Sequence, residues 1–265
     1  ETLWWLLKQL YNKGLLYKGY TIQPYSPAAG TGLSSHELNQ PGCYRDVKDT
    51  TVTAQFEIVN PKEAWTHHGK AYFLAWTTTP WTLPSNVALC VGPKIDYVAV
   101  ETYNPYDGEP MTAIMAESRL AAYLDPKQEV KEGELPAFDK AKKQCPWRII
   151  DRMKGTDLEG MHYQQLMPWV KPCEKVSEYS HAFVNEYAEA HPGKVFTGEN
   201  GRDKFVEMSS EAFRVILGDY VTTEDGTGIV HIAPTFGADD AKVAKDAKIP
   251  ALYLISKKGE TRPMV

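Results

Sequence analysis

The first twenty residues carry apolar side chains at the spacing of an amphipathic helix. Apolar positions recur every three to four residues and the lysines fall off the stripe, which predicts a helix; the stripe is Trp4, Leu7, Leu10, Tyr11 and Leu15. Residues 21–43 are rich in Gly, Pro and Ser and predict a loop. We therefore expect a helical and loop connector over 1–45 and the main domain over 46–265. Because the helical pattern starts without an initiator methionine, we also expect the chain to be a domain of a longer polypeptide.

Beyond the connector the pattern changes to short alternating or continuously apolar segments, which predict strands. The predicted strands are 51–59, 71–78, 96–103, 111–116, 147–153, 195–197, 204–208, 228–232 and 251–255. Helical spacing is less frequent and predicts helices over 117–124, 174–191, 210–217 and 239–247. The predicted strands outnumber the predicted helices, and the two do not alternate regularly along the chain, which indicates an α+β fold. We expect a β-barrel-like, curved sheet core with short helices at its periphery.

Composition limits the classes of function. The 265 residues, 43% of them hydrophobic, can bury one sizeable core, and no apolar run approaches the roughly 20 residues of a membrane helix. The formal charge of -5 argues against binding nucleic acid mainly by neutralising phosphates. The four cysteines form no CxxC pair, so neither a zinc site nor a disulfide framework is indicated. We expect a cytoplasmic protein with no membrane partner.

The common catalytic signatures are missing from the sequence. It contains no GxSxG, HExxH, GxxxxGK[ST] or GxGxxG motif, so the usual nucleophile, zinc and nucleotide sites have no support. The adjacent His67 and His68 fit a surface turn better than a metal site. We therefore expect no metal and no cofactor in this chain.

Two other stretches are unusual. WTTTPWTLPSN at 76–86 sets three adjacent hydroxyls between rigid apolar groups, and GTGIVHIAPTFGADD at 226–240 joins two glycines to a short strand and an acidic pair. Taken singly, each has an ordinary structural explanation. The threonines suit a strand, His231 suits a hydrogen-bonded core position, and Asp239 and Asp240 suit the first turn of a helix.

Taken together, in this order, the two stretches resemble the threonine-rich loop and the Gly-Thr-Gly strand of the editing domain of class I isoleucyl-tRNA synthetases. YKGYTIQPYSPAAGTGLSSHE at 17–37 and KGTDLEGMHYQQL at 154–166 are similar to further segments of that family. The valine and leucine enzymes carry Arg-Pro where this chain has Thr79-Pro80. The chain lacks HIGH-type and KMSKS-type motifs, so the resemblance implies no amino-acid activation here; ATP and Mg would serve the absent activation domain.

The resemblance implies a hydrolase that deacylates mischarged valyl-tRNA(Ile) after transfer. It places Thr78, Thr79 and Asp240 in the catalytic machinery, with Asp240 holding the α-ammonium of the substrate. It assigns Thr77, Asn86 and His231 to substrate binding, with His231 as a wall that excludes isoleucine by size. Trp81 is assigned there too, although packing alone would explain it. The implied partners are the tRNA(Ile) acceptor end with a noncognate amino acid and the remainder of the synthetase, in a monomer.

Two other functions stay open at this point. A valyl-type editing domain would hydrolyse threonyl-tRNA, and a module that has lost hydrolysis would only bind RNA. The threonine run, Asn86, His231 and Asp240 are all present, which argues against such a loss. Phe236 departs from the family pattern, because many bacterial relatives carry a histidine there. That departure puts any role for a second histidine in doubt.

Overall fold

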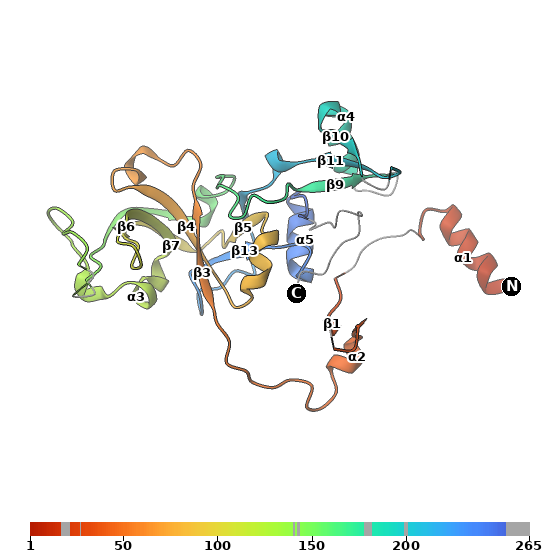
Figure 1. Ribbon diagram of the computed structural model, residues 1–265, viewed down its shortest axis with the longest axis horizontal. Helices are drawn as coiled ribbons and strands as arrows, with labels where there is room; N and C mark the ends of the chain where they lie inside the picture. The colour runs from red at the N-terminus through yellow and green to blue at the C-terminus, as the bar shows by residue number, and fades with distance from the viewer. Residues whose placement is uncertain are drawn as a thin grey trace.

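The structure is a computed structural model. It describes residues 1–16, 22–26, 28–139, 141, 144–177, 182–198 and 201–252. Within these residues most of the chain forms three β-sheets that lie side by side, with a small N-terminal part away from them (Figure 1).

The largest sheet has five strands in the order β3-β4-β7-β6-β8. Their bounds are β3 Val52–Glu57, β4 Lys70–Thr77, β7 Pro110–Ala116, β6 Asp96–Tyr103 and β8 Arg148–Lys154. β4 and β7 pair in parallel, whereas the other neighbours are antiparallel. The sheet alternates side chains between two apolar clusters: in β4, Ala71, Phe73 and Ala75 face one cluster and Leu74 faces the other. Both faces of this sheet are therefore covered.

A second sheet, of three strands, lies next to the first. Its order is β12-β5-β13, with β12 Arg214–Leu217, β5 Ala88–Val91 and β13 Ile229–Ile232. β5 pairs in parallel with β12 and antiparallel with β13, and every residue of β5 is buried. A strand buried on both faces reads as a continuous apolar run, which suits the sequence ALCV. β13 contacts β4 of the larger sheet, so the two sheets meet at these strands.

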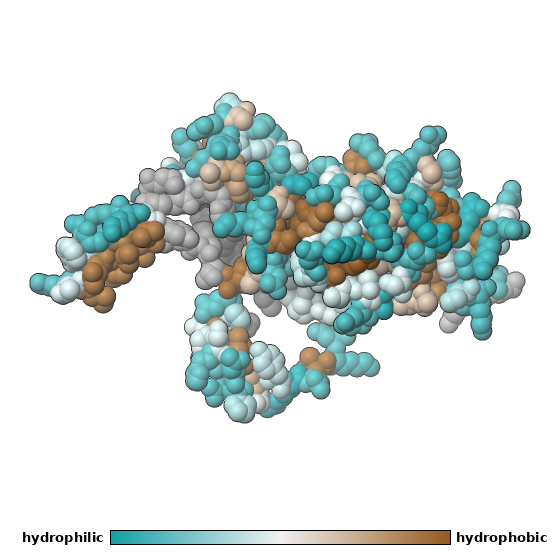
Figure 2. All heavy atoms as spheres, turned by 180° about the vertical axis from the view of Figure 1, so that it is seen from behind, coloured by the Kyte–Doolittle hydropathy of each residue, from teal (hydrophilic) through white to brown (hydrophobic). Residues whose placement is uncertain are grey.

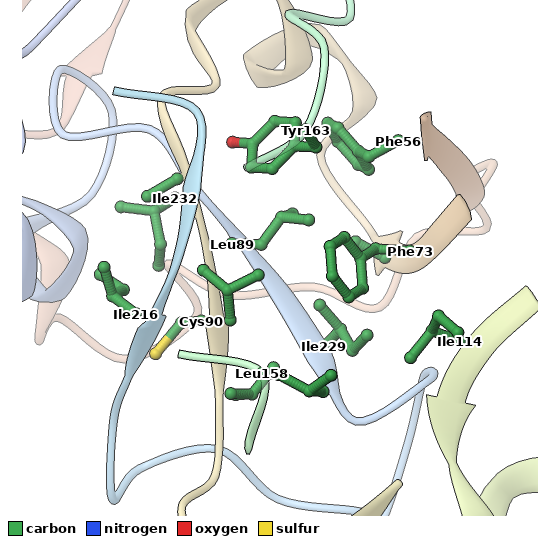
Figure 3. Close-up of a cluster of buried hydrophobic side chains, with 14 of the residues drawn as sticks. Phe56, Phe73, Leu89, Cys90, Ile114, Leu158, Tyr163, Ile216, Ile229 and Ile232 are labelled. Atoms are coloured by element: carbon green, nitrogen blue, oxygen red, sulfur yellow. The ribbon is translucent and has the colours of Figure 1, made fainter. Parts of the chain in front are cut away.

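The main core lies between these two sheets. Figure 3 shows Phe73 of β4 beside Leu89 of β5 and Ile229 of β13, all of them fully or almost fully buried. Removing a side chain of this kind from water contributes about 1.5–3 kcal/mol. This shared core fixes the position of the threonine stretch relative to β13.

A third sheet, β10-β11-β9, forms a separate small layer at the top of Figure 1. It consists of β10 Val195–Thr197, β11 Lys204–Glu207 and β9 Cys173–Val176, and α4 Ala182–Ala190 packs on it. This layer has an apolar cluster of its own, formed by Val184, Ala188, Val206 and Met208.

The N-terminal elements bury little. They are α1 Thr2–Asn12, β1 Tyr25–Ser26, β2 Thr31–Gly32 and α2 Ser35–Leu38. α1 has no buried residue, and in Figure 2 its apolar stripe is exposed as a brown band. α2 begins with a capping box, in which Ser34 and Glu37 exchange hydrogen bonds.

The remaining helices are short. They are η1 Glu63–Trp65, η2 Pro80–Ser85, η3 Glu117–Arg119, α3 Leu120–Tyr123, η4 Pro126–Gln128, η5 Gly155–Asp157, η6 Pro192–Lys194, η7 Ser209–Glu211 and α5 Ala238–Asp246. No helix in the described part of the chain is long and apolar enough to span a bilayer.

The α+β class is confirmed, but the barrel-like closure is wrong. The five-stranded sheet ends in two different strands, β3 and β8, and none of the described sheets closes on itself. Closure requires the two edge strands to pair with one another. Here a second sheet packs against the first and buries the shared face instead.

Two of the predicted helices are also partly or wholly wrong. Residues 210–217 form η7 and then β12, because the apolar run pairs in parallel with β5. The first part of 174–191 is β9, which pairs with β11, and only Ala182–Ala190 is helical among the described residues. Of the strand predicted over 251–255, residues 251 and 252 are not in a strand and the rest lie outside the described residues. The other predicted strands and helices are confirmed to within a few residues.

Candidate functional site

A chain of threonine hydroxyls begins where β4 ends. Thr77 is buried at the last position of β4, and its Oγ1 accepts a hydrogen bond from the backbone N–H of Thr79 at 3.0 Å. The two hydroxyl oxygens, Thr77 Oγ1 and Thr79 Oγ1, lie 3.2 Å apart. Pro80 then starts η2, where its fixed backbone angle suits the first helical position. The segment 77–82 therefore forms a tight, internally bonded loop, which we call the threonine loop.

Thr82 links the threonine loop to β13. Its hydroxyl donates to the carbonyl oxygen of Thr79 at 2.7 Å, and the same oxygen lies 3.0 Å from His231 Nε2. A threonine hydroxyl has only one hydrogen, so with that hydrogen given to Thr79 the histidine is the donor in the second bond. His231 then carries its proton on Nε2. Its Nδ1 is a bare acceptor, buried and without a partner in the described part of the chain.

The His231 side chain is neutral at physiological pH. It is 7% exposed, and burial lowers its pKa to about 4. Burial has this effect because removing the ring from water disfavours the charged form. Next to the threonine loop the site therefore has an uncharged ring whose second nitrogen, Nδ1, is a buried acceptor.

Asp240 is held close to the end of the same strand. It lies in the first turn of α5, and its Oδ2 accepts a hydrogen bond from the backbone N–H of Ala233 at 2.9 Å. Burial raises the pKa of the Asp240 carboxyl above its usual range, which the Ala233 bond partly opposes and the neighbouring Asp239 reinforces. A carboxylate that is costly to ionise in isolation gains most from a cationic ligand. Its Oδ1 makes no hydrogen bond to any described residue.

Asn86 lies beneath the loop, and both polar atoms of its amide group make a hydrogen bond. Its Nδ2 donates to the carbonyl of Ala88 at 2.8 Å, and its Oδ1 accepts from the hydroxyl of Tyr163 at 2.6 Å. The residue is 3% exposed. In this arrangement Asn86 joins η2, β5 and the segment after β8, and it supports the loop from below.

The two other predicted residues of the loop lie on its outside. Thr78 is exposed, and Trp81 is 47% exposed. A ring with half of its surface free is not held by packing alone, and it offers an apolar face next to the threonine hydroxyls. Phe236 is half-buried in the turn that joins β13 to α5, where its N–H donates to the carbonyl of Ala233.

The structure thus brings Thr77, Thr79 and His231 into one bonded cluster and places Asp240 at the end of the strand that carries His231. Sequence reasoning missed Thr82, which makes the contact to His231. The available signal was its position three residues after Thr79, one turn of a 3-10 helix. Sequence reasoning also missed Tyr163, which holds Asn86. No local pattern pointed to Tyr163, because 77 residues separate the pair.

Among the described residues, no three His, Cys, Asp or Glu side chains gather as metal ligands would. Two buried hydroxyls near the ends of the site segments, Ser85 Oγ and Thr235 Oγ1, also have no partner there. Unpaired buried polar atoms are rare in folded proteins and are commonly satisfied by water or a ligand.

Isoleucine–tRNA ligases match the chain over all or nearly all of its length. The isoleucine–tRNA ligase of Bacteroides thetaiotaomicron is 62% identical over 266 residues, which cover 100% of this chain and 20% of that protein. The isoleucine–tRNA ligase of Porphyromonas gingivalis is 58% identical with the same coverage, and that of Treponema denticola is 41% identical over 95% of this chain. The chain spans about a fifth of the length of these relatives. No family model matches the chain.

Solved structures give weaker matches. The GlLeuRS-CP1 crystal structure shares 17% identity over 74% of this chain and 58% of that chain, with a TM-score of 0.43. The editing domain of the P. knowlesi cytosolic leucyl-tRNA synthetase shares 15% identity over 75% of this chain and 63% of that one, with a TM-score of 0.41. On the strength of the sequence relatives, the chain is homologous along its whole length to one segment of the isoleucine–tRNA ligases.

Proposed function

We propose that this chain is the post-transfer editing domain of an isoleucine–tRNA ligase and hydrolyses the ester bond of valyl-tRNA(Ile). The observation that carries the proposal is the contact between the threonine loop and a buried, neutral His231, together with the Asp240 carboxylate of α5, which is bonded to Ala233 directly after the strand that carries His231. The loop supplies hydrogen-bonding groups, the ring supplies a wall, and the carboxylate supplies a charge. These are the three functions that sorting and hydrolysing an aminoacyl ester requires.

The need for such a site comes from a small energy difference. Isoleucine and valine differ by one methylene, a well-known case in which a hydrophobic pocket discriminates by only about 1–3 kcal/mol. A second site that admits valine and excludes isoleucine removes the residual errors. Steric exclusion there adds to the discrimination of the first pocket, because forcing an extra methylene into a packed space costs about a further 1–3 kcal/mol.

His231 is the wall in this proposal. Thr82 fixes the ring from one side, so the ring cannot turn away from a larger side chain. With a pKa of about 4, the ring carries no charge at neutral pH and does not repel the α-ammonium of the substrate. The same value makes it a poor proton acceptor at that pH, so its role is to set size.

Asp240 holds the α-ammonium group. Its Oδ2 is bound to Ala233, and its Oδ1 is left for the ligand. A charge-assisted bond at this point fixes the orientation of the ester carbonyl relative to the threonine loop. Burial raises the pKa of Asp240, so the ionised carboxylate is disfavoured in the empty site. The positive charge of a bound α-ammonium group stabilises that ionised form, which is the form that binds the ammonium.

The threonine loop positions water and stabilises the oxyanion. A water oxygen attacks the ester carbonyl carbon and the carbonyl oxygen becomes negative; as the carbonyl forms again, the bond to the ribose oxygen breaks, and that oxygen takes up the proton that the attacking water has lost. Hydroxyls of Thr78 and Thr79 can donate to one oxygen and accept from another. A positioned water together with fixed donors lowers the barrier without a covalent intermediate.

The partners follow from the same assignment. The acceptor end of tRNA(Ile) would enter beside the exposed Trp81, whose free face can stack on a base. The exposed apolar stripe of α1 would pack against the remainder of the synthetase, so 1–45 is the connector and 46–265 the editing domain. Amino-acid activation, with its ATP and Mg, would take place in that remainder.

The test compares ester hydrolysis by the wild-type chain and two aspartate variants. Asp240→Ala removes the partly buried carboxylate, whereas Asp239→Ala removes its exposed neighbour in the same helical turn and serves as the matched control. Each protein is incubated with valyl-tRNA(Ile), isoleucyl-tRNA(Ile) and threonyl-tRNA(Val), and free amino acid is measured over time. We expect the wild type and Asp239→Ala to cleave the valyl ester and to spare the isoleucyl ester. We expect the rate of valyl ester cleavage by Asp240→Ala to be lower by roughly 100-fold or more.

The other outcomes identify the alternatives. A preference for the threonyl ester would assign the chain to the valyl type. Binding of tRNA without cleavage of any ester, also within the full-length synthetase, would show a module that only binds RNA. Equal activity of Asp240→Ala and Asp239→Ala would remove Asp240 from the mechanism.

A further inference from the structure

The Gly-Thr-Gly turn that precedes β13 is bonded on one side to the five-stranded sheet. Arg119 donates from Nε to the carbonyl of Gly226 at 2.8 Å and from Nη1 to the carbonyl of Glu224 at 2.9 Å. The N–H of Ala116 donates to the carbonyl of Thr227 at 2.9 Å, and the hydroxyl of Tyr97 donates to the carbonyl of Gly228 at 2.6 Å. Four carbonyls within five residues are therefore held by groups of β6, β7 and η3.

This arrangement depends on the two glycines. Gly226 and Gly228 both have positive φ, 67° and 74°, so the backbone turns in a way that L-residues with side chains rarely adopt. A side chain at Gly226 would collide with Trp76, the residue just before Thr77. The turn therefore lies against the start of the threonine loop as well as against the donors of the larger sheet.

The position of β13 depends on this turn. β13 is an edge strand of its sheet, paired only with β5 in the described structure, and it begins one residue after Gly228. Its third residue is His231, whose ring makes the 3.0 Å contact to Thr82. A short strand bonded on one side slides or tilts more readily than a central one, so the turn sets where His231 lies relative to the loop.

We propose that Arg119 is a positioning residue for the editing reaction: its guanidinium holds the 224–226 carbonyls, and thereby keeps His231 at the threonine loop. This inference rests on the proposed function. Arg119 differs from the other donors of the turn because its side chain is only partly buried and lies outside the apolar core, whereas Tyr97 is fully buried. Removing the guanidinium releases the turn without opening a core cavity.

The variants are Arg119→Ala and Arg119→Lys, with Arg152→Ala as the matched control. Arg152 is an exposed arginine that pairs with Glu117, also in η3, at 3.0 Å and does not contact the turn. For each protein we would measure kcat and KM for valyl-tRNA(Ile), the rate with isoleucyl-tRNA(Ile), the thermal midpoint, and the rate after addition of guanidinium ion well below denaturing concentrations. Hydrogen exchange at the amides of 229–231 gives a readout that does not depend on activity.

For Arg119→Ala we expect kcat for the valyl ester to fall roughly 10- to 100-fold, the range that a misplaced site produces, with KM changed far less. The valyl-to-isoleucyl rate ratio falls too, because the wall is no longer fixed. Added guanidinium restores part of kcat, and the amides of 229–231 exchange faster. Arg119→Lys, which keeps the charge and can make one of the two bonds, lies between Arg119→Ala and the wild type.

Arg119→Ala behaving like Arg152→Ala in kcat, rate ratio and exchange would overturn the inference while leaving the proposed function intact. A loss of kcat that tracks a lowered thermal midpoint and is not restored by guanidinium would also overturn it, because that is the behaviour of general destabilisation. If the wild type cleaves no ester, the proposed function fails. In that case, hydrogen exchange at the amides of 229–231 that is the same in Arg119→Ala as in the wild type would also overturn the positioning role of Arg119.

Discussion

At the scale of single residues, one hydrogen bond decides what His231 can do. Because Thr82 gives its hydrogen to Thr79, His231 must donate from Nε2, and the ring is fixed in one tautomer and one orientation. Burial then keeps that ring uncharged. A histidine in this state acts through its shape and through the single acceptor Nδ1, and it is unsuited to proton transfer near neutral pH.

The pKa of His231 also makes the stability of the fold depend on pH. Above pH 6.5 the ring is neutral in both the folded and the unfolded chain. Between pH 6.5 and about 4 only the unfolded chain takes up the proton, so the free energy of unfolding falls as the pH falls, by a total on the order of 3 kcal/mol. In His231→Gln, which has no titratable ring, this part of the pH dependence is expected to be absent.

Urea unfolding of the wild type and His231→Gln at a series of pH values checks this. The difference between the two curves isolates His231, because the other titrating groups are common to both proteins. Two curves that stay parallel from pH 7 to pH 4 would show that the folded ring titrates like an exposed histidine.

The sequence allowed us to predict the candidate site residues that lie within a motif, but not the residues that hold them in place through hydrogen bonds. Thr77 to Thr79, His231 and Asp240 stand in two short stretches of unusual composition, so they could be singled out without a structure. Tyr163 could not, because its role comes from a bond to Asn86 that only the fold creates. Whether the residues singled out perform the assigned roles remains a prediction for the hydrolysis test.

At the scale of elements, the alternation of side chains predicted the five-stranded sheet well, but it predicted only β13 of the three strands in the sheet that carries His231. β3, β4, β6, β7 and β8 have recognisable strand patterns, with β6 predicted at its observed bounds. β5 was missed and β12 was assigned to a helix. β5, ALCV, is wholly apolar, and β12, RVIL, is apolar after its first residue. Such short apolar runs have no period by which to tell strand from helix.

The Tyr163–Asn86 bond ties these elements together and gives a test of their support for the loop. Tyr163→Phe keeps the ring, which packs edge-on against Phe56 with centroids 5.2 Å apart, and removes only the hydroxyl. Asn86 Oδ1 then loses its donor in a buried position, so we expect the free energy of unfolding to fall by about 1–3 kcal/mol.

Urea denaturation of Tyr163→Phe beside Tyr44→Phe measures that cost. Tyr44 is exposed, and removal of its hydroxyl should leave the free energy of unfolding unchanged. An equal effect of both substitutions would mean that the Tyr163 hydroxyl contributes nothing to the support of Asn86.

At the scale of the whole molecule, stability resides in the sheets and not in the N-terminal elements. α1 contributes no buried residue, and its large apolar side chains are exposed. Deleting residues 2–16 should therefore change the free energy of unfolding by no more than about 0.5 kcal/mol. Leu89→Ala, in the centre of the shared core, should lower it by about 2–5 kcal/mol.

Chemical denaturation of these two variants separates the contributions. A deletion that costs as much as Leu89→Ala would show that α1 packs on the domain in solution. The retained stability expected here would agree with our proposal that the stripe of α1 belongs to an interface with the rest of the synthetase.

The position of β5 has a consequence for the order in which the molecule is made. β5 lies between β12 and β13, yet both partners come more than a hundred residues later in the chain. During synthesis this fully apolar strand leaves the ribosome long before either neighbour exists. Pairings between such distant segments slow folding, because a long loop must close first. Until residue 232 has emerged, the nascent chain carries an unpaired, aggregation-prone strand, and the site cannot assemble.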